Sequence, residues 1–190
     1  MATPTNWKPN EWTLFTDRDG VLNYLITGDY IKSWDEFHFI PGAIEAFEKL
    51  TRLFKRIVIV TNQRGIRREV MTEADLHNIH EKMLAEVEAG GGKIDGVYFC
   101  ANHPEDDPEN CRKPAIGMAL WAKEDFPDIE FEKSIMLGDN ISDMEFGRNA
   151  NMHTVFICQD GPPSAKAHLV DEHCQGVVAF ADRYHALAKQ

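Results

Sequence analysis

Two aspartates stand two positions apart after an apolar stretch, in the segment FTDRDGVLN of residues 15–23. Side chains two apart on an extended chain point to the same side, so Asp17 and Asp19 can face one site. Gly20 then lets the backbone turn sharply. An aspartate can attack phosphorus and form an aspartyl-phosphate. A second carboxyl group nearby can protonate a leaving oxygen and then take a proton from water. The spacing therefore favours a carboxylate pair that acts on a phosphate ester.

Three further short segments carry side chains that such chemistry needs. Thr61 and Asn62 open the segment TNQRG, and Lys113 follows a long loop. The segment GDNISD holds Asp139 and Asp143. A hydroxyl and an ammonium group would hold the phosphoryl oxygens as charge shifts. Clustered carboxylates repel one another unless a cation joins them, and oxygen ligands without histidine favour Mg²⁺.

Each segment also has an ordinary structural interpretation. Asp-x-Asp-Gly is common in turns and in calcium loops, although the EF-hand spacing is absent here. The pair at 61–62 can be a turn and helix cap, Lys113 can lie in a solvated loop, and GDNISD can be a capping stretch. Four such segments in order, each tied to a predicted strand end, favour one shared site over coincidence.

Predicted strands and helices alternate along the chain. The predicted strands cover residues 12–17, 56–62, 96–101, 134–139, 153–158 and 176–181. The predicted helices cover residues 41–54, 115–126 and 142–150, a helix from Thr72 to the glycines at 90–92, one before residue 176 and one at the C-terminus. Such alternation predicts an α/β, Rossmann-like fold with a mostly parallel sheet and helices on both faces. Ligands of such sheets bind at the carboxyl ends of the strands.

Length and composition predict one globular domain over residues 1–190, because 190 residues with 43% hydrophobic content can bury a sizeable core. The net charge of −11 gives no support for nucleic acid or an acidic membrane as partner, but it permits a small phosphorylated metabolite. No apolar run approaches a membrane span and the first ten residues lack an apolar signal core, so we expect a cytoplasmic protein. Four widely spread cysteines favour reduced thiols or metal binding over disulfides. The oligomeric state stays open.

The four segments DRDGVLN, TNQ, KP and GDNISD resemble, in order, the four motifs of the haloacid dehalogenase-like phosphohydrolases. The resemblance spans Asp17 to about Asp143 and implies a Mg²⁺-dependent phosphomonoester hydrolase that works through an aspartyl-phosphate. The resemblance implies that Asp17 is the nucleophile, that Asp19 is the general acid and base, and that Thr61 and Lys113 bind the phosphoryl group. It also implies that Mg²⁺ is bound by Asp17, by Asp139 and by the backbone carbonyl of Asp19. Asn140 and Asp143 would support the metal.

A finer resemblance, carried by GDYI, TNQRGI and CRKPAIGM, is to the small branch that contains heptose-1,7-bisphosphate 7-phosphatases and histidinol-phosphate phosphatases. The room before Lys113 suits one helix–strand unit and a loop, so we expect no large cap domain. Loops, with Asn62 and Arg112, would then bind the substrate. A guanidinium fork suits a second phosphate, although Arg112 can instead pair with the acids of PEDDPEN.

The resemblance leaves three functional alternatives. A heptose 1,7-bisphosphate is the first expectation for the substrate, and histidinol phosphate is the second. A catalytically dead phosphate-binding module is the alternative of another class, although no motif residue is lost.

Relatives in that branch carry a zinc loop that reads Cys-x-His and then Cys-x-Cys before Arg-Lys-Pro. Here Cys100 and Cys111 match the outer ligands, but Asn102 replaces the histidine and Glu109 replaces a cysteine, with His103 next door. Structural zinc takes four good donors. We therefore treat Cys100, His103 and Cys111 as a degenerate zinc loop and expect it to be free of zinc.

Overall fold

Residues 3–107 and 110–189 are described by the structure, a computed structural model. The strands are β1 (Thr13–Thr16), β2 (Arg56–Asn62), β3 (Gly96–Cys100), β4 (Ser134–Gly138), β5 (His153–Ile157) and β6 (Glu172–Cys174). The α-helices are α1 (Ala43–Leu53), α2 (Glu73–Ala89), α3 (Gly117–Asp125), α4 (Ile141–Asn149) and α5 (Val177–Leu187), and 3₁₀ turns lie at η1 (Trp34–Glu36), η2 (Phe131–Lys133) and η3 (Ser164–Leu169).

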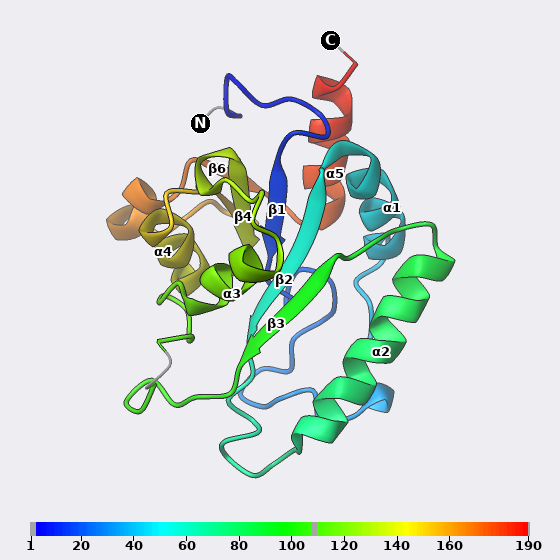
Figure 1. The fold of residues 1–190 in the computed structure, drawn as a ribbon, viewed down its shortest axis with the longest axis vertical. Helices are drawn as coiled ribbons and strands as arrows, with labels where there is room; N and C mark the ends of the chain where they lie inside the picture. Colours follow the sequence, from blue (N-terminus) through cyan, green and yellow to red (C-terminus); the bar gives the residue numbers. More distant parts are fainter. Residues whose placement is uncertain (1–2, 108–109, 190) are drawn as a thin grey trace.

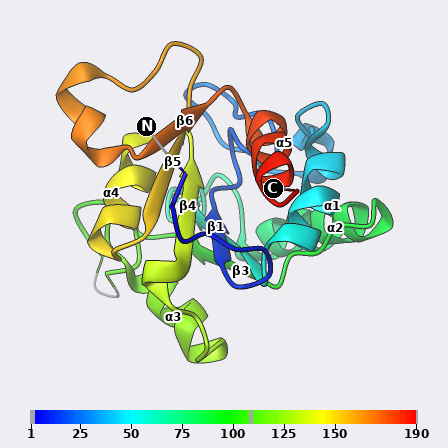
Figure 2. The ribbon, with the colours of Figure 1, turned by 90° about the horizontal axis from the view of Figure 1, so that it is seen from above.

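All six strands pair in parallel in one sheet of order β3-β2-β1-β4-β5-β6 (Figure 1). The expected α/β fold is confirmed. Helices α1, α2 and α5 cover one face of the sheet, and α3 and α4 cover the other (Figure 2). None of the helices in the described part of the chain is long and apolar enough to cross a membrane.

The apolar run of β2 follows from these two helix layers. Ile57 and Ile59 belong to the core that includes α1, α2 and α5, whereas Val58 and Val60 belong to the core that includes α3 and α4. Because both faces of the strand are buried, nearly every side chain along it is apolar.

The central position of β1 decides where its aspartates lie. From β1 the chain first builds β2 and β3 on one side, and it then crosses to build β4, β5 and β6 on the other side. The sheet therefore has its topological switch point beside β1, which is where open α/β sheets bind ligands. The backbone N–H of Asp17 donates to Leu137 O of β4 at 2.9 Å, which fixes the first aspartate beside the end of that strand.

The prediction of a strand over residues 176–181 was wrong. The last strand is β6, and Gly176 precedes helix α5. The buried residues Val177, Phe180, Ala181 and Tyr184 recur at helical spacing and pack on α1, so the apolar run is a helix face. The helix expected before residue 176 is the 3₁₀ turn η3.

Candidate active site

A cavity of about 820 Å³ opens where β1, β2 and β4 end. The strand ends bring together on its wall the predicted residues Asp17, Asp19, Asn62, Arg112, Lys113, Asp139 and Asn140. Thr61 and Asp143 are buried behind the wall. Segments from four parts of the chain thus meet at one site, as the parallel sheet predicts.

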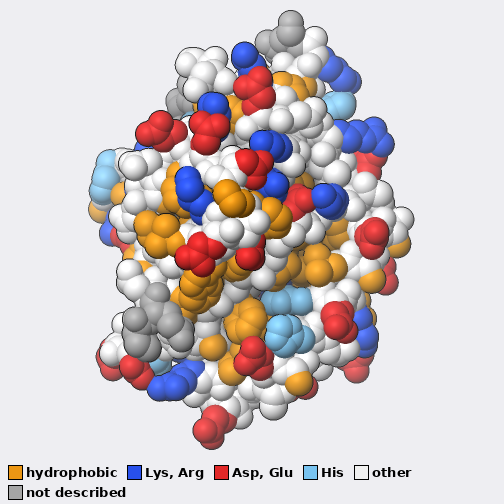
Figure 3. All heavy atoms as spheres, viewed as in Figure 1, with side chains coloured by type: hydrophobic (Ala, Val, Ile, Leu, Met, Phe, Trp, Pro, Cys, Tyr) orange, Lys and Arg blue, Asp and Glu red, His pale blue; other side chains and the backbone are white. Residues whose placement is uncertain are grey.

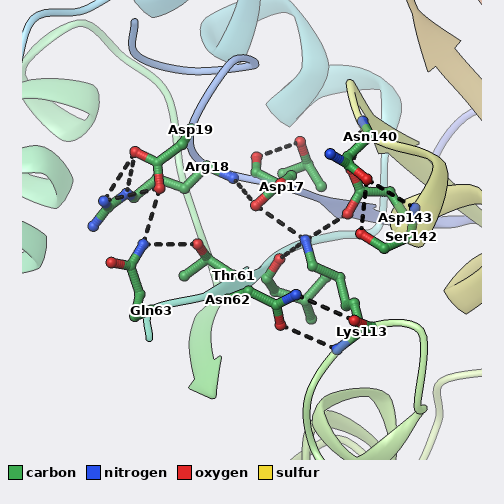
Figure 4. Close-up of polar contacts among 12 residues, drawn as sticks. Asp17, Arg18, Asp19, Thr61, Asn62, Gln63, Lys113, Asn140, Ser142 and Asp143 are labelled. Carbon is green, nitrogen blue, oxygen red and sulfur yellow. Dashed lines mark hydrogen bonds and ion pairs between the residues drawn. The ribbon is translucent and has the colours of Figure 1, made fainter. Parts of the chain in front are cut away.

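Lys113 lies at the centre of this site (Figure 4). Its Nζ lies 3.0 Å from Asp17 Oδ1 and 2.6 Å from Asp143 Oδ1, and it donates to Val60 O at 2.8 Å. Burial alone would lower the pKa of Lys113, but Asp143 and Asp17 raise it above its ordinary value, so the side chain is a cation at neutral pH. Asn62 holds the backbone of this lysine, because its Oδ1 accepts from Lys113 N at 3.0 Å and its Nδ2 donates to Lys113 O at 3.3 Å.

Three carboxylates face one another beside that lysine. Oxygens of Asp17, Asp139 and Asp143 all lie within 4.8 Å of one another. Burial raises the pKa of Asp17 to about 7, opposed by Lys113 and increased by Asp143. Burial, together with Asp143, raises the pKa of Asp139 to about 6. Among the described residues, one ammonium group, that of Lys113, pairs with carboxylates of this cluster, so the cluster is short of positive charge. Its oxygen ligands fit Mg²⁺.

Two glycines bring backbone close to these carboxylates. A Cβ on Gly20, which has φ +81°, would lie 1.9 Å from Asp139 Oδ2, and a Cβ on Gly138 would lie 2.4 Å from Asp143. Only glycine permits such an approach at these two positions. The backbone of these glycines therefore packs directly against the carboxylates, which keeps the candidate cation site compact.

The N-terminus of α4 holds the remaining predicted metal-supporting residues. Asp143 Oδ2 accepts from Asn140 N at 3.0 Å, and Asn140 Oδ1 accepts from Ser142 N at 3.1 Å. This capping box fixes both side chains and aims the positive end of the helix dipole at the cavity. The segment GDNISD is therefore a helix cap and a wall of the site at once.

The carboxylate of Asp19 is held by three side chains, of which Figure 4 shows Arg18 and Gln63. Arg18 donates from Nε at 3.3 Å and from Nη2 at 2.9 and 3.0 Å, and Asn23 and Gln63 each donate at 2.9 Å. Burial would raise the pKa of Asp19, but Arg18 and these amides hold it below its ordinary value. The sequence analysis did not assign a role to any of the three donors, although all stand within or beside the motifs.

Gln63 also explains why Thr61 lies behind the wall. Its Nε2 donates to Thr61 Oγ1 at 3.0 Å as well as to Asp19. Thr61 and Asp19 are thereby linked through one amide, which couples the second motif to the first. The only sequence signal for this link was the position of Gln63 directly after the predicted strand end.

The loop that returns from β3 corrects the expectation for the cysteines. Cys100 and Cys111 form a disulfide with Cα atoms 5.6 Å apart, whereas Cys158 and Cys174 are free thiols. The disulfide was missed because the spacing of the cysteines in the sequence does not show how close their side chains lie in the folded protein.

The side chain beside the two cysteines of the degenerate zinc loop is also not the one expected. Asp107, and not His103, shares a potential ligand cluster with the two cysteines. His103 Nδ1 instead accepts from Glu105 N at 3.4 Å. Asp107 Oδ1 accepts from Asn102 Nδ2 at 2.9 Å, so the loop turns around this carboxylate. Glu109 lies outside the described residues.

Arg112 borders the cavity next to Lys113. Its Nη1 donates weakly to Asn102 O at 3.5 Å, and its backbone N–H donates to Asp107 Oδ2 at 2.8 Å. Among the described residues no carboxylate lies within ion-pair distance of its guanidinium, so the pairing with the acids of PEDDPEN is not found in the described part of that segment. Burial, and then Arg64, lower the pKa of Arg112 below its ordinary value, whereas Tyr30 and the charge of Asp107 oppose this shift.

The other arginines after β2 have separate partners. Arg64 Nε donates to Tyr30 OH at 3.0 Å, which ties the turn after β2 to the loop after β1. Arg67 forms an exposed ion pair with Asp106 at 2.7 Å.

Comparison with known proteins adds names to this geometry. The family model described as polynucleotide kinase 3 phosphatase matches residues 12–182. A D-glycero-alpha-D-manno-heptose-1,7-bisphosphate 7-phosphatase of Mycobacterium bovis is 39% identical over 141 residues, which are 74% of this chain and 73% of the relative. A D-glycero-beta-D-manno-heptose-1,7-bisphosphate 7-phosphatase of Escherichia coli K12 is 36% identical over 156 residues, which are 79% of this chain and 80% of the relative.

Similar solved structures also include heptose 1,7-bisphosphate phosphatases. The D,D-heptose 1,7-bisphosphate phosphatase of B. bronchiseptica, complexed with magnesium and phosphate, superposes with a TM-score of 0.79 at 28% identity and covers 94% of this chain and 99% of its own. The corresponding phosphatase of Burkholderia thailandensis gives a TM-score of 0.64 at 26% identity, with 91% and 97% covered.

Proposed function

The chain belongs to the haloacid dehalogenase-like phosphatases, and from that premise we propose that it removes the 7-phosphate of a D-glycero-D-manno-heptose 1,7-bisphosphate. The relatives act, by their names, on the alpha or the beta anomer, and their identities to this chain differ by little. A cytoplasmic setting belongs to the proposal, because a phosphorylated sugar is too highly charged to cross a membrane unaided.

Asp17 is the proposed nucleophile. Its Oδ1 receives a hydrogen bond from Arg18 N at 2.7 Å and lies 3.0 Å from Lys113 Nζ, so one carboxylate oxygen is fixed in place. The carboxylate attacks phosphorus, an O–P bond forms on Asp17, and the sugar oxygen leaves. The charge that builds on the phosphoryl oxygens is stabilised by Lys113.

Asp19 is the proposed general acid and base. The negative charge of a phosphate ester bound beside Asp19 would raise the pKa of its carboxyl group, so that Asp19 gains the proton that it gives to the leaving sugar oxygen. Asp19 then takes a proton from the water that hydrolyses the aspartyl-phosphate. About a quarter of its side-chain surface is exposed at the cavity, while its hydrogen-bond donors lie behind it. Thr61 is proposed to contact the phosphoryl group, and its place behind the wall implies a small adjustment when substrate enters.

Asp17, Asp139 and the backbone carbonyl of Asp19 are the proposed ligands of Mg²⁺, with Asn140 and Asp143 as their support. The bound cation would neutralise phosphate charge during transfer. The fit rests on the three facing carboxylates and on the close approach of Gly20. No zinc role is proposed for the Cys100–Cys111 loop.

A bisphosphate is favoured as substrate by one observation. The guanidinium of Arg112 lines the same cavity as Asp17, and among the described residues no carboxylate lies within ion-pair distance of it, although Asp107 is near enough to affect its pKa. Such a group binds a phosphate oxygen pair well. Asn62 is proposed to contact substrate from the same wall, in addition to holding Lys113.

The test is a steady-state screen that compares both heptose 1,7-bisphosphate anomers with histidinol phosphate and common sugar monophosphates. We expect the highest kcat/KM with a heptose bisphosphate, no turnover in chelator, and recovery on adding Mg²⁺. Asp17→Asn should lose nearly all turnover, since an amide cannot attack phosphorus. Preference for histidinol phosphate, or full activity of Asp17→Asn, would overturn the substrate or the mechanism, respectively.

A further inference from the structure

Arg18, between the two aspartates, carries a guanidinium that is completely buried, with 0% of its side chain exposed. Its Nε and Nη2 donate to Asp19, as described above, and its Nη1 lies 3.1 Å from His80 Nε2 on α2. The ring of Phe37 lies below the guanidinium, 5.8 Å from its centre. Arg18 therefore links the carboxylate at the cavity to a histidine in the helix layer behind it.

His80 can only accept in this contact, because an arginine has no acceptor and is never neutral. Burial, and then the charge of Arg18, lower the pKa of His80 to about 3, while Asp19 opposes and His77 assists this shift. The imidazole is thus neutral, with its proton on Nδ1 and a lone pair on Nε2 for Arg18. Thr72 starts α2 with a capping box, so the helix carries His80 to this place firmly.

We propose that His80 is a positioning residue for proton transfer: it fixes the guanidinium of Arg18, and Arg18 in turn holds the carboxyl group of Asp19 at the cavity wall. The inference rests on the proposed role of Asp19. During phosphoryl transfer, the P–O bond of the substrate breaks as the Asp17 O–P bond forms, and the proton of Asp19 goes to the leaving oxygen. His80 touches none of these atoms.

The directions of the contacts favour this role over simple core packing. Among the described residues, the guanidinium of Arg18 hydrogen-bonds to Asp19 and His80 and to no other side chain. Burying a guanidinium is costly unless each donor is satisfied. The position of the Arg18 guanidinium therefore depends on both of its partners, Asp19 and His80. Of these two, Asp19 has 26% of its side chain exposed at the cavity. Loosening His80 should loosen the orientation of that carboxyl group.

The experiment compares two phosphate esters that need general acid help to different degrees. An alkyl phosphate such as glycerol phosphate leaves as a poor alkoxide, whereas 4-nitrophenyl phosphate leaves as a stable phenolate. For His80→Leu, which removes the acceptor, we expect kcat/KM for the alkyl ester to fall about tenfold more than for the aryl ester, within the range known for loss of proton-transfer help. His80→Gln, which can still accept, should recover most of this loss.

The matched control is His77→Leu. His77 lies one turn earlier on α2, packs on the same Phe99 ring, has 59% of its side chain exposed and has no contact with Arg18. It should leave both esters unchanged. Melting temperatures of all variants, and their Mg²⁺ requirement, separate a local effect from a folding defect. Equal losses on the two esters in His80→Leu, or no recovery in His80→Gln when it folds as well as the parent, would overturn the proposal.

Asp19→Asn separates the inference from its premise. If Asp19→Asn loses far more activity on the alkyl ester while His80→Leu does not, Asp19 is the acid and only the role of His80 fails. If Asp19→Asn loses equally on both esters, the proposed role of Asp19 fails, and the positioning role falls with it.

Discussion

The charge of the carboxylates Asp17 and Asp143 is partly balanced by the side chain of Lys113. Among the described residues, Lys113 is the cation within ion-pair distance of both Asp17 and Asp143, and all three are mostly buried. Removing one member of a buried ionic group leaves its partners uncompensated, which costs more than the group contributes when intact. The site therefore tolerates loss of Lys113 only if another cation takes its place.

We predict that Lys113→Met abolishes most activity and, in chelator, lowers the free energy of unfolding by about 3–5 kcal/mol. Mg²⁺ should then raise the melting temperature of the variant more than that of the parent, because the ion supplies missing positive charge. Thermal unfolding with chelator and with Mg²⁺ measures both effects. Lys133→Met is the control, since its exposed pair with Glu130 should contribute at most about 1 kcal/mol. An identical Mg²⁺ shift in Lys113→Met and parent would contradict the charge argument.

At the scale of residues, the sequence predicted several side chains that contact the cavity, and Asn62, which holds Lys113, but it missed the side chains that hold Asp19. Asp17 and Asp139 were predictable because their motifs follow strand ends, and parallel strands end together. Lys113 was predictable because it stands in the third motif, on the loop that returns from β3. Arg18 and His80 are 62 positions apart, and nothing in the local pattern of α2 indicates that His80 reaches a motif. Such contacts depend on how a helix packs on the sheet, which short-range spacing does not specify.

The loop from β3 to α3 forms part of the cavity wall and is closed by the Cys100–Cys111 disulfide. Asp107 fastens the same loop from inside, since its carboxylate accepts from the backbone N–H groups of Cys111 at 3.1 Å and Arg112 at 2.8 Å. The loop is thus held by a disulfide and by the hydrogen bonds of Asp107, and only the disulfide depends on redox conditions. Reducing compartments disfavour the disulfide.

We predict that protein purified without reductant and then denatured has two titratable thiols, those of Cys158 and Cys174, and four after reduction. Closing a loop of this length should stabilise the fold by about 2–3 kcal/mol, so reduction should lower the melting temperature. Cys111→Ser should show three thiols, and Cys158→Ser should show one without changing the loop. Four thiols accompanied by one zinc ion per chain would show that a metal closes the loop instead.

Strand β6 is joined to its neighbours by one buried carboxylate. Glu172 accepts from His153 Nε2 of β5 at 2.8 Å, and from Tyr184 OH at 2.8 Å and Arg183 Nη1 at 2.9 Å, both on α5. Burial would raise the pKa of Glu172, but His153, Tyr184 and Arg183 hold it below its ordinary value of 4.5. A lowered pKa means that this stabilisation is full above 4.5 and is lost as the pH falls through the folded-state value.

We predict that Glu172→Gln lowers the free energy of unfolding by about 1–3 kcal/mol near neutral pH, because the buried donors lose a charged acceptor. The difference from the parent should shrink as the pH falls below 4.5, where the parent carboxylate also becomes neutral. Urea unfolding at a series of pH values measures it. Glu145→Gln, which removes an exposed partner of Lys166, should cost less than about 1 kcal/mol. A difference that stays constant down to acidic pH would rule out the ionic contribution.

Elements were predictable where one signal dominated. The observed bounds of β2 equal the predicted ones, because a short, β-branched run is typical of a strand that is buried on both faces. Residues 176–181 offered an apolar run of similar length, and the choice between strand and helix depended on contacts of α5 with α1, which begins 134 positions earlier in the chain. Short apolar runs remain ambiguous without that tertiary information.

At the scale of the whole molecule, charge works against the proposed substrate. The chain has a net charge of −11, and a bisphosphate approaches a surface where acidic and basic side chains are interspersed (Figure 3). The long-range field therefore does not attract the substrate, and binding must come from cations at the cavity itself. Lys113 is already paired with carboxylates, which leaves Arg112 as the lining side chain with a cation available for a second phosphate.

We predict that Arg112→Ala lowers kcat/KM for a heptose bisphosphate by about 10–150-fold, the equivalent of 1.5–3 kcal/mol for a hydrogen bond to a charged group. Turnover of a simple monophosphate should change little, because the transferred phosphate is held by Lys113. Arg68→Ala is the control, since Arg68 is exposed and does not line the cavity. Because the contact is a partly buried ion pair, added salt should weaken bisphosphate binding less than a surface pair would allow. Equal losses on bisphosphate and monophosphate would mean that Arg112 shapes the loop or the reacting phosphate site, and that the second phosphate is bound elsewhere.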